Sequence, residues 1–318
     1  MQFRTQIPIE KSNNLIDYSS RILAVGSCFA ENMGDKFEYF KFQNCVNPFG
    51  IIFNPVAIEN LVSRVVHQRK FTESAIFFHN DLWHCYEVHS KLSDPNKEAF
   101  LETLNDLIDT TLEQLKNATH IIITLGTSWV YRHIETNEIV ANCHKVPQKQ
   151  FVKEILSIET IEKSIQNTID FIRKINPNCH FIFTVSPVRH IKDGFVKNQR
   201  SKAHLITALH QVLQVPPLGA EGAYFPSYEI LMDELRDYRF YADDMLHPSQ
   251  AAIDYIWIQF FENYISASEF ATMSQVCEIQ RALKHKPFNP NTENHKKFLE
   301  KLDEKIARIQ KQFPQIKF

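Results

Sequence analysis

A serine that follows an apolar run and an Asp-x-x-His sequence late in the chain are the residues whose types and spacing could do chemistry. Ser27 comes directly after RILAVG (21–26), and beyond it Phe29, Met33 and Phe37 recur at helical spacing. A turn from a strand into a helix exposes its side chain at the edge of a sheet and aims backbone N–H groups at whatever lies beside it. This position suits a nucleophile, and it also suits a helix N-cap, for which serine is a preferred residue.

The stretch YADDMLHPSQ supplies the two groups that a nucleophilic serine needs. A serine attacks only when a base takes its proton, and that base must be oriented by a third group. Asp244 and His247 lie three residues apart, so one loop can carry the imidazole and place a carboxylate against its other nitrogen. Asp243 is the alternative carboxylate, and His247 has the alternative role of capping a helix that begins at Pro248. We expect Ser27 as nucleophile, His247 as general base and Asp244 as the residue that orients this base.

An oxyanion hole requires donors aimed at the negative charge that develops on the substrate carbonyl. Three features at strand ends are candidates: the N–H of Ser27, the N–H of a glycine such as Gly50, and a polar side chain after HIIITLG (120–126). Cys28 is a rival nucleophile, because the same helix N-terminus would favour its thiolate. As a small buried residue, Cys28 needs no function at all, and this is the interpretation we prefer.

Strands that alternate with helices must position these groups. The clearest predicted elements are three strands and one long helix: 21–26, 120–126, 180–187 and 158–175. This alternation predicts βαβ units and a mainly parallel sheet covered by helices on both faces, which is an α/β fold. The working site of such a sheet lies at the carboxyl ends of its strands. Ser27, Thr127 and Ser186 are therefore expected at one edge.

Shorter elements are predicted between the main strands. AIFFHNDLWHCYEV (75–88) has an Asn80-Asp81 break that indicates a hairpin, and a second hairpin is predicted around 135–137. Asp94 is expected to cap a helix in which Pro95 takes the first position.

Several motifs carry a resemblance to a known family. GSCFA at 26–30, followed late in the chain by DMLHP, is similar to the plan of the SGNH (GDSL-like) hydrolases. More closely, the chain resembles the GSCFA domain family over residues 20–285. The other segments that support this resemblance are NPFGIIFNP (47–55), WHCYEVHS (83–90), ANCHK (141–145), TVSPVRH (184–190) and YFPSYEI (224–230).

The resemblance implies a three-layer, flavodoxin-like SGNH-hydrolase fold with a mainly parallel central sheet. It implies the same roles for Ser27, His247 and Asp244 as the residues themselves do, and it makes Gly50 the second oxyanion donor. No cofactor is implied.

One departure from the SGNH pattern concerns the oxyanion hole. SGNH enzymes usually follow the third strand with Gly-x-Asn-Asp, whose Asn completes the hole, whereas this chain has LGTSW. Thr127, Ser128 or Asn142 would have to substitute. His89, by the family likeness, and His190, by its place at a strand end, are candidates for lining the substrate cleft, and each also has a purely structural reading.

Composition excludes several classes of protein. The chain has 318 residues, of which 44% are hydrophobic and 23% charged, with a formal net charge of −2, so neither nucleic acid nor an anionic membrane is indicated as a partner. No apolar run is long enough to span a bilayer. The six cysteines are scattered without CxxC pairs, which is typical of reduced thiols. The N-terminus lacks the pattern of a secretory signal, and we therefore expect a cytoplasmic protein.

A metal site is the remaining reading of WHCYEVH. Cys85, Glu87 and His89 would share one face of a strand, but the chain offers no second cluster with ligand spacing. We expect no metal.

These observations predict two parts and one activity. Residues 1–265 form the α/β domain, and 266–318 form a helical C-terminal extension that packs on the domain or on a second copy in a homodimer. The expected activity is a serine esterase or acyltransferase that cleaves or transfers an O-acyl group, such as acetyl, on a small-molecule or carbohydrate ester. The alternative is a module that binds acylated ligands and has lost catalysis, because the usual Asn is absent.

Overall fold

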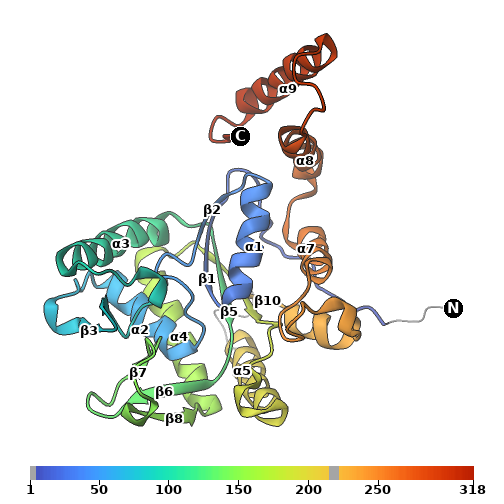
Figure 1. Cartoon of the computed structure of the whole chain (residues 1–318). Helices are drawn as coiled ribbons and strands as arrows, with labels where there is room; N and C mark the ends of the chain where they lie inside the picture. The colour runs from blue at the N-terminus through green and yellow to red at the C-terminus, as the bar shows by residue number, and fades with distance from the viewer. Residues whose placement is uncertain (1–4, 215–221) are drawn as a thin grey trace.

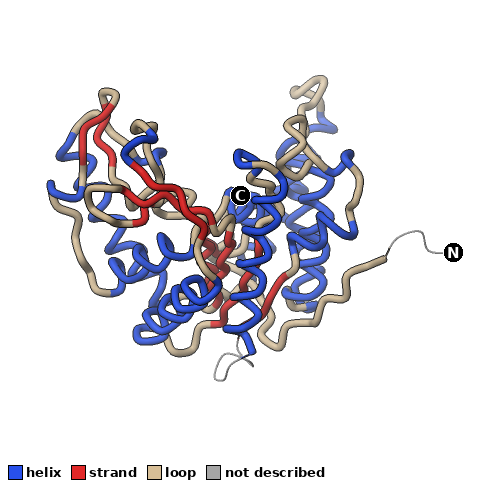
Figure 2. The backbone as a smooth tube through the Cα atoms, turned by 90° about the horizontal axis from the view of Figure 1, so that it is seen from below, coloured by secondary structure: helices blue, strands red, loops and turns tan. Residues whose placement is uncertain are grey.

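The protein is built around a five-stranded sheet in which every strand pair is parallel, with strand order β10-β9-β5-β1-β2. The computed structural model describes residues 5–214 and 222–318. Helices cover both faces of the sheet (Figures 1 and 2). The predicted three-layer α/β fold with a helical C-terminal region is confirmed.

The strands of the central sheet are β1 (Arg21–Gly26), β2 (Gln43–Val46), β5 (His120–Leu125), β9 (His180–Val185) and β10 (Gly222–Phe225). The long helices are α1 (Cys28–Tyr39), α2 (Pro55–Val66), α3 (Lys97–Asn117), α4 (Ile158–Ile175), α5 (Phe195–Gln214), α7 (Gln250–Tyr264), α8 (Phe270–Lys284) and α9 (Glu293–Gln312). A short helix α6 (Ser227–Glu229) continues into a π-helical turn over Ile230–Glu234.

The alternation of side chains along each strand divides the core into two layers. In β1, Ile22 and Ala24 pack with α1 and α7, whereas Leu23 packs with the helices α2 to α5. In β9, Ile182 belongs to the first layer and Phe183 to the second. Because strand side chains alternate with period two, a sheet covered on both faces needs apolar residues at nearly every position, and RILAVG and HFIFTV meet this need.

Antiparallel strands form a lobe beside the main sheet (Figure 2). They are β3 (Phe77–His79), β4 (Leu82–His84), β6 (Trp129–His133), β7 (Ile139–Val140) and β8 (Phe151–Ile155). Both predicted hairpins are confirmed: β3 pairs with β4, and β6 pairs with β7. Asn80 and Asp81 have φ of 46° and 61°, the left-handed conformation that tight hairpin turns require.

Two predicted helix starts are wrong by a few residues. The N-cap of α3 is Asn96, whose side chain accepts a hydrogen bond from Ala99 N–H, while Asp94 instead accepts from the N–H of Asn96. The N-cap of α7 is Ser249, so Pro248 precedes that helix. In both places a polar residue nearer the helix satisfies the free N–H groups of the first turn.

The helical C-terminal region packs against the layer that holds α1 and α7. Met273 and Val276 of α8 and Leu302 and Ile309 of α9 are buried in that core, and the rings of Tyr18 and Phe313 lie 4.8 Å apart. The expectation that 266–318 packs on the domain agrees with these contacts, whereas a homodimer and a domain boundary at residue 265 stay predictions. No helix among residues 5–214 and 222–318 has the length and apolar character needed to cross a membrane.

Gly26 is expected to be essential for folding. Its φ of +138° is unfavourable for other residues, and an added Cβ would lie 2.1 Å from Thr124 O on the neighbouring strand. Gly26→Ala should therefore lower the free energy of unfolding by about 4 kcal/mol or more, as measured by urea denaturation. Gly194→Ala is the matched control, because Gly194 also has a positive φ (+93°) but no atom within 4 Å of the added Cβ. Equal losses in the two variants would contradict this account.

Candidate active site

The carboxyl ends of β1, β5 and β9 meet at one edge of the sheet, as the sequence predicts. Ser27 N–H donates to Thr124 O at the end of β5 (3.0 Å), and Ser186 N–H donates to Leu125 O (2.8 Å). Asn47, just after β2, accepts a hydrogen bond from Gly26 N–H through its Oδ1 (2.8 Å). Together these bonds fix the turn on which Ser27 lies.

Ser27 is the N-cap of α1. Its Oγ accepts a hydrogen bond from Phe29 N–H (3.3 Å), and the residue is 1% exposed. The structure therefore bears out the capping role, with the hydroxyl at the helix N-terminus, where partial positive charge favours an alkoxide. Among the described residues, His247 is not a hydrogen-bond partner of Ser27.

Asp244 and His247 form the predicted pair within one loop. His247 Nδ1 lies 2.5 Å from Asp244 Oδ2, and Asp244 Oδ1 accepts from the N–H groups of Leu246 and His247 at 2.9 Å each. These hydrogen bonds, with those from His247 first, lower the pKa of Asp244 to about 2. The carboxylate therefore stays charged and holds Nδ1, which leaves Nε2 to act as a base.

Arg189 links this loop to the end of β9. Its N–H donates to Leu246 O (3.3 Å), its Nη2 donates to Met245 O (3.0 Å), and its guanidinium lies 4.1 Å from the centre of the Tyr241 ring. The loop that carries His247 is thus tied to the same sheet edge as Ser27. Sequence reasoning did not single out Arg189.

The two predicted backbone oxyanion donors are already engaged within the fold. Ser27 N–H donates to Thr124 O, and Gly50 N–H donates to Asn47 O at 2.7 Å, closing the turn of the NPFG segment. Gly50 has a φ of +76° and lies directly beneath His89, since an added Cβ would be 2.4 Å from His89 Cβ. An oxyanion role for either N–H would require it to share or release its present bond.

Thr127 and Ser128 face α5 rather than the Ser27 turn. Thr127 Oγ1 lies 2.8 Å from Ser201 Oγ, and Ser128 Oγ donates to Ser201 O at 3.2 Å. Both residues are buried. Their hydrogen bonds join the end of β5 to α5. We therefore no longer propose Thr127 or Ser128 as an oxyanion donor.

Asn142 follows β7 in the antiparallel lobe, whereas His89 packs against Gly50. Asn142 Oδ1 accepts from His144 N–H (2.8 Å), and His144 Nε2 contacts Cys85 O at 2.7 Å. His89 is half-buried over Gly50, and desolvation lowers its pKa. His89 therefore borders the turn that precedes α2, while Asn142 braces a loop of the lobe.

His190 is close to both His247 and the sheet edge. Its ring stacks on Phe53, with ring centroids 5.5 Å apart, and its Nε2 is buried without a hydrogen-bond partner. Burial, together with the nearby charges of Lys202 and His247, lowers the pKa of His190 to about 3. His190 is therefore a neutral side chain at this edge, as a lining residue would be.

A buried lysine is the main feature that sequence reasoning missed. Lys202, on α5, is 0% exposed, and its Nζ donates to Gly126 O and Ser186 O at 2.7 Å each. The signal was present in the helical spacing, because Leu205 and Leu209 follow Lys202 on the same buried face.

Cys28, the rival nucleophile, is half-buried. Desolvation and the charge of Glu31 raise the pKa of its thiol. A raised pKa disfavours the thiolate, which is the reactive form. This environment favours the structural interpretation of Cys28.

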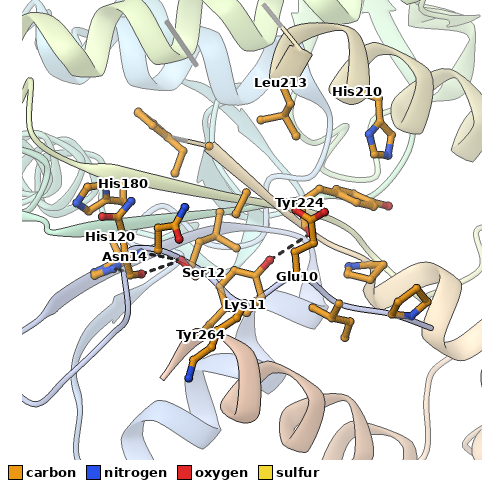
Figure 3. Close-up of a pocket in the computed structure, with 18 of the residues that line it drawn as sticks. Glu10, Lys11, Ser12, Asn14, His120, His180, His210, Leu213, Tyr224 and Tyr264 are labelled. Carbon is orange, nitrogen blue, oxygen red and sulfur yellow. Dashed lines mark hydrogen bonds between the residues drawn. The ribbon is translucent and has the colours of Figure 1, made fainter. Parts of the chain in front are cut away.

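A cavity of about 560 Å³ opens at the opposite end of the sheet (Figure 3). It lies at the amino-terminal ends of β5, β9 and β10, where His120 Nε2 contacts Asn14 O at 3.2 Å, and it is lined by none of the predicted site residues. Within residues 5–214 and 222–318, no group of three or more His, Cys, Asp or Glu side chains is arranged to hold a metal ion.

Buried histidines should make the protein sensitive to acid. Burial lowers the pKa of His120 and of His144 to about 4. Because the unfolded chain binds these protons near pH 6.5 and the folded protein does not, stability should fall as the pH drops from about 6.5 towards 4, by roughly 2 kcal/mol per histidine. Urea denaturation at each pH measures this slope, which His120→Gln should reduce and the exposed His285→Gln should not. A slope that His120→Gln leaves unchanged would contradict the assignment.

The family assignment follows from comparison with known proteins. No curated protein matches the sequence. A model described as the GSCFA family matches residues 21–260, which include Ser27, Asp244 and His247, and a model described as the C-terminal domain of GSCFA domain proteins matches residues 276–318. The first match covers most of the chain and the whole of the parallel sheet. The chain therefore belongs to the GSCFA family.

Proposed function

We propose that the protein is a serine hydrolase or acyltransferase that acts on an O-acyl ester. The observation that carries this proposal is the Asp244–His247 pair, held at 2.5 Å in a loop tied to the sheet edge where Ser27 begins α1. A carboxylate that orients an imidazole beside a serine is the arrangement that activates a hydroxyl for attack on an acyl carbon.

In the proposed reaction, Ser27 Oγ attacks the acyl carbon while His247 Nε2 takes the hydroxyl proton. Asp244 holds Nδ1–H and stabilises the imidazolium that forms. The same proton then passes to the leaving alkoxide as the C–O bond breaks, which leaves an acyl-serine and a free alcohol. Water, or the hydroxyl of an acceptor, attacks the acyl-serine with His247 again as base, and Ser27 is regenerated.

We assign the N–H of Cys28 as a donor to the developing oxyanion. It belongs to the first residue of α1, and its present interaction is with the thiol of its own residue. First-turn N–H groups have no acceptor within the helix, and the helix dipole favours negative charge at this end. This replaces the predicted pair of Ser27 and Gly50, whose N–H groups are engaged elsewhere.

A carbohydrate ester, acetylated for example, is the substrate class that we propose from the resemblance to SGNH enzymes. This step rests on analogy of fold and motif. We propose no cofactor, because Ser27, His247 and Asp244 supply the proton transfers and the nucleophile that acyl transfer requires.

Binding without turnover is the second candidate function, and one observation favours it. Ser27 is 1% exposed and is not hydrogen-bonded to His247, so the triad is not closed. Catalytic hydrogen bonds often tighten only when substrate binds, and the hydrolase proposal requires this movement. A binding module would require no such change.

Turnover with and without an acceptor separates these functions. The wild-type protein is incubated with an activated acetyl ester, with and without a polyol, and both acyl release and transfer products are measured. A hydrolase releases acetate at a rate that the polyol leaves unchanged, whereas a transferase is accelerated and forms the acylated polyol. Reversible binding of an acetylated sugar with no release, and with equal affinity in Ser27→Ala, would support the binding module and contradict the enzyme.

A further inference from the structure

Lys202 places a positive charge inside the protein at the carboxyl edge of the sheet. The residue is 0% exposed, and Nζ donates to the carbonyls of Gly126 and Ser186, the residues that directly follow β5 and β9. These two bonds leave a third N–H that no hydrogen bond among the described residues uses.

This charge has no close counter-ion in the part of the chain that the structure describes. No ion pair joins Lys202 to a carboxylate there, and Glu229 and Cys28 interact with it only at longer range. The Tyr228 ring lies 5.4 Å away, and His190 is close enough for the ammonium to lower its pKa. Burying an ammonium that has no carboxylate partner is costly. Packing alone therefore does not explain a lysine at this position.

The charge acts on the turn that carries Ser27. Burial raises the pKa of Cys28, the residue next to Ser27, and the Lys202 charge opposes this rise. Burial likewise lowers the pKa of Lys202, and the interaction with Cys28 opposes that fall. Both side chains are shielded from bulk solvent, because Ser27 is 1% exposed and Lys202 is fully buried. Coulomb interactions are several times stronger in such a medium than in water.

We propose that Lys202 assists acyl transfer electrostatically, because its buried ammonium stabilises the negative charge that develops on the acyl oxygen beside Ser27. In this role it replaces the Asn that SGNH enzymes place after the third strand, where this chain has Thr127 and Ser128. The inference rests on the proposed function. It differs from a purely structural role, in which Lys202 would only join the ends of β5 and β9.

Neutral replacements at position 202 test the proposal. Lys202→Gln keeps N–H donors for the two carbonyls without the charge, and Lys202→Met removes both. Lys197→Gln, which removes an exposed charge from the same helix, is the matched control. Circular dichroism establishes that each variant is folded. The first readout is the rate at which a fluorophosphonate labels Ser27 between pH 5 and 9.

We expect both neutral variants to be labelled about tenfold or more slowly than the control. Burial lowers the pKa of Lys202 to about 7, so wild-type labelling should decline as the pH rises above that value, and the neutral variants should lack this decline. The wild-type decline needs no variant and so remains a test if both variants unfold. Unchanged labelling rates and pH profiles in folded variants would overturn the proposal.

Alkylation of Cys28 separates this inference from the proposed function. Iodoacetamide modification at pH 6.5, mapped by mass spectrometry, reports the charge at the turn without any catalysis. Loss of the Lys202 charge should slow it at least about threefold, because the thiol pKa rises. If the alkylation of Cys28 slows in the Lys202 variants but Ser27 of the wild type is never labelled, the proposed function fails. The proposed role of Lys202 in acyl transfer then fails with it. If Ser27 is labelled but neither rate changes in the variants, the inference alone is wrong.

Discussion

Ser27→Ala is expected to lower the turnover of an activated acyl ester by at least about a thousandfold and to leave the protein folded. The large loss follows from the proposed function, in which Ser27 is the residue that forms the acyl intermediate with the help of His247. The stability cost should be about 1 kcal/mol, the usual effect of losing an N-cap, because the Ser27 hydroxyl makes one hydrogen bond, from Phe29 N–H. Initial rates and urea denaturation measure the two quantities.

Cys28→Ala is the matched control for this prediction. Cys28 is adjacent to Ser27, and its raised thiol pKa makes it a poor nucleophile. Turnover should fall by less than about threefold, since the proposed donor at this residue is its backbone N–H. A thousandfold loss in Cys28→Ala, with activity kept in Ser27→Ala, would exchange the two roles.

Asp244→Asn is expected to lower kcat/KM by about a thousandfold or more. The amide oxygen can still accept the N–H groups of Leu246 and His247, so the loop should keep its shape. What is lost is the negative charge 2.5 Å from His247 Nδ1, which fixes the tautomer and stabilises the imidazolium. Steady-state kinetics at pH 8 measure this effect.

Asp243→Asn distinguishes the two adjacent carboxylates. Asp243 is exposed, and among the described residues it makes no hydrogen bond to His247, so its replacement should change kcat/KM by less than about twofold. Equal losses in the two variants would mean that the net charge of the loop matters, and not the orientation of His247.

The central strands and the loop that carries Asp244 and His247 were predictable because local patterns determine them. HIIITL and HFIFTV are apolar at nearly every position, as a strand buried on both faces requires, and they form β5 and β9. The Asp244–His247 contact joins residues three apart, so the spacing alone limits its geometry. In both cases the information lies within a few residues of the chain.

The surroundings of Ser27 were not predictable, because they depend on contacts between distant segments. The hydrogen bond from Gly26 N–H to Asn47 Oδ1 and the burial of Lys202 between two strand ends follow from the packing of β2 and α5 against the sheet. The hydrogen bonds of the Thr127 and Ser128 hydroxyls with Ser201 likewise depend on the packing of α5 against the sheet. A polar residue on a helix is predicted to be solvent-exposed unless its helical spacing from the apolar residues shows that it lies on the buried face.

Mapping a covalent phosphonate adduct tests the central claim most directly. The folded wild-type protein is treated with a fluorophosphonate, digested and analysed by mass spectrometry beside His247→Ala and Asp244→Asn. The account predicts an adduct on Ser27 that forms rapidly in the wild type and at least about a hundredfold more slowly in His247→Ala. An adduct on Cys28, or no adduct on Ser27 in folded wild-type protein, would contradict the assignment of Ser27 as an activated nucleophile.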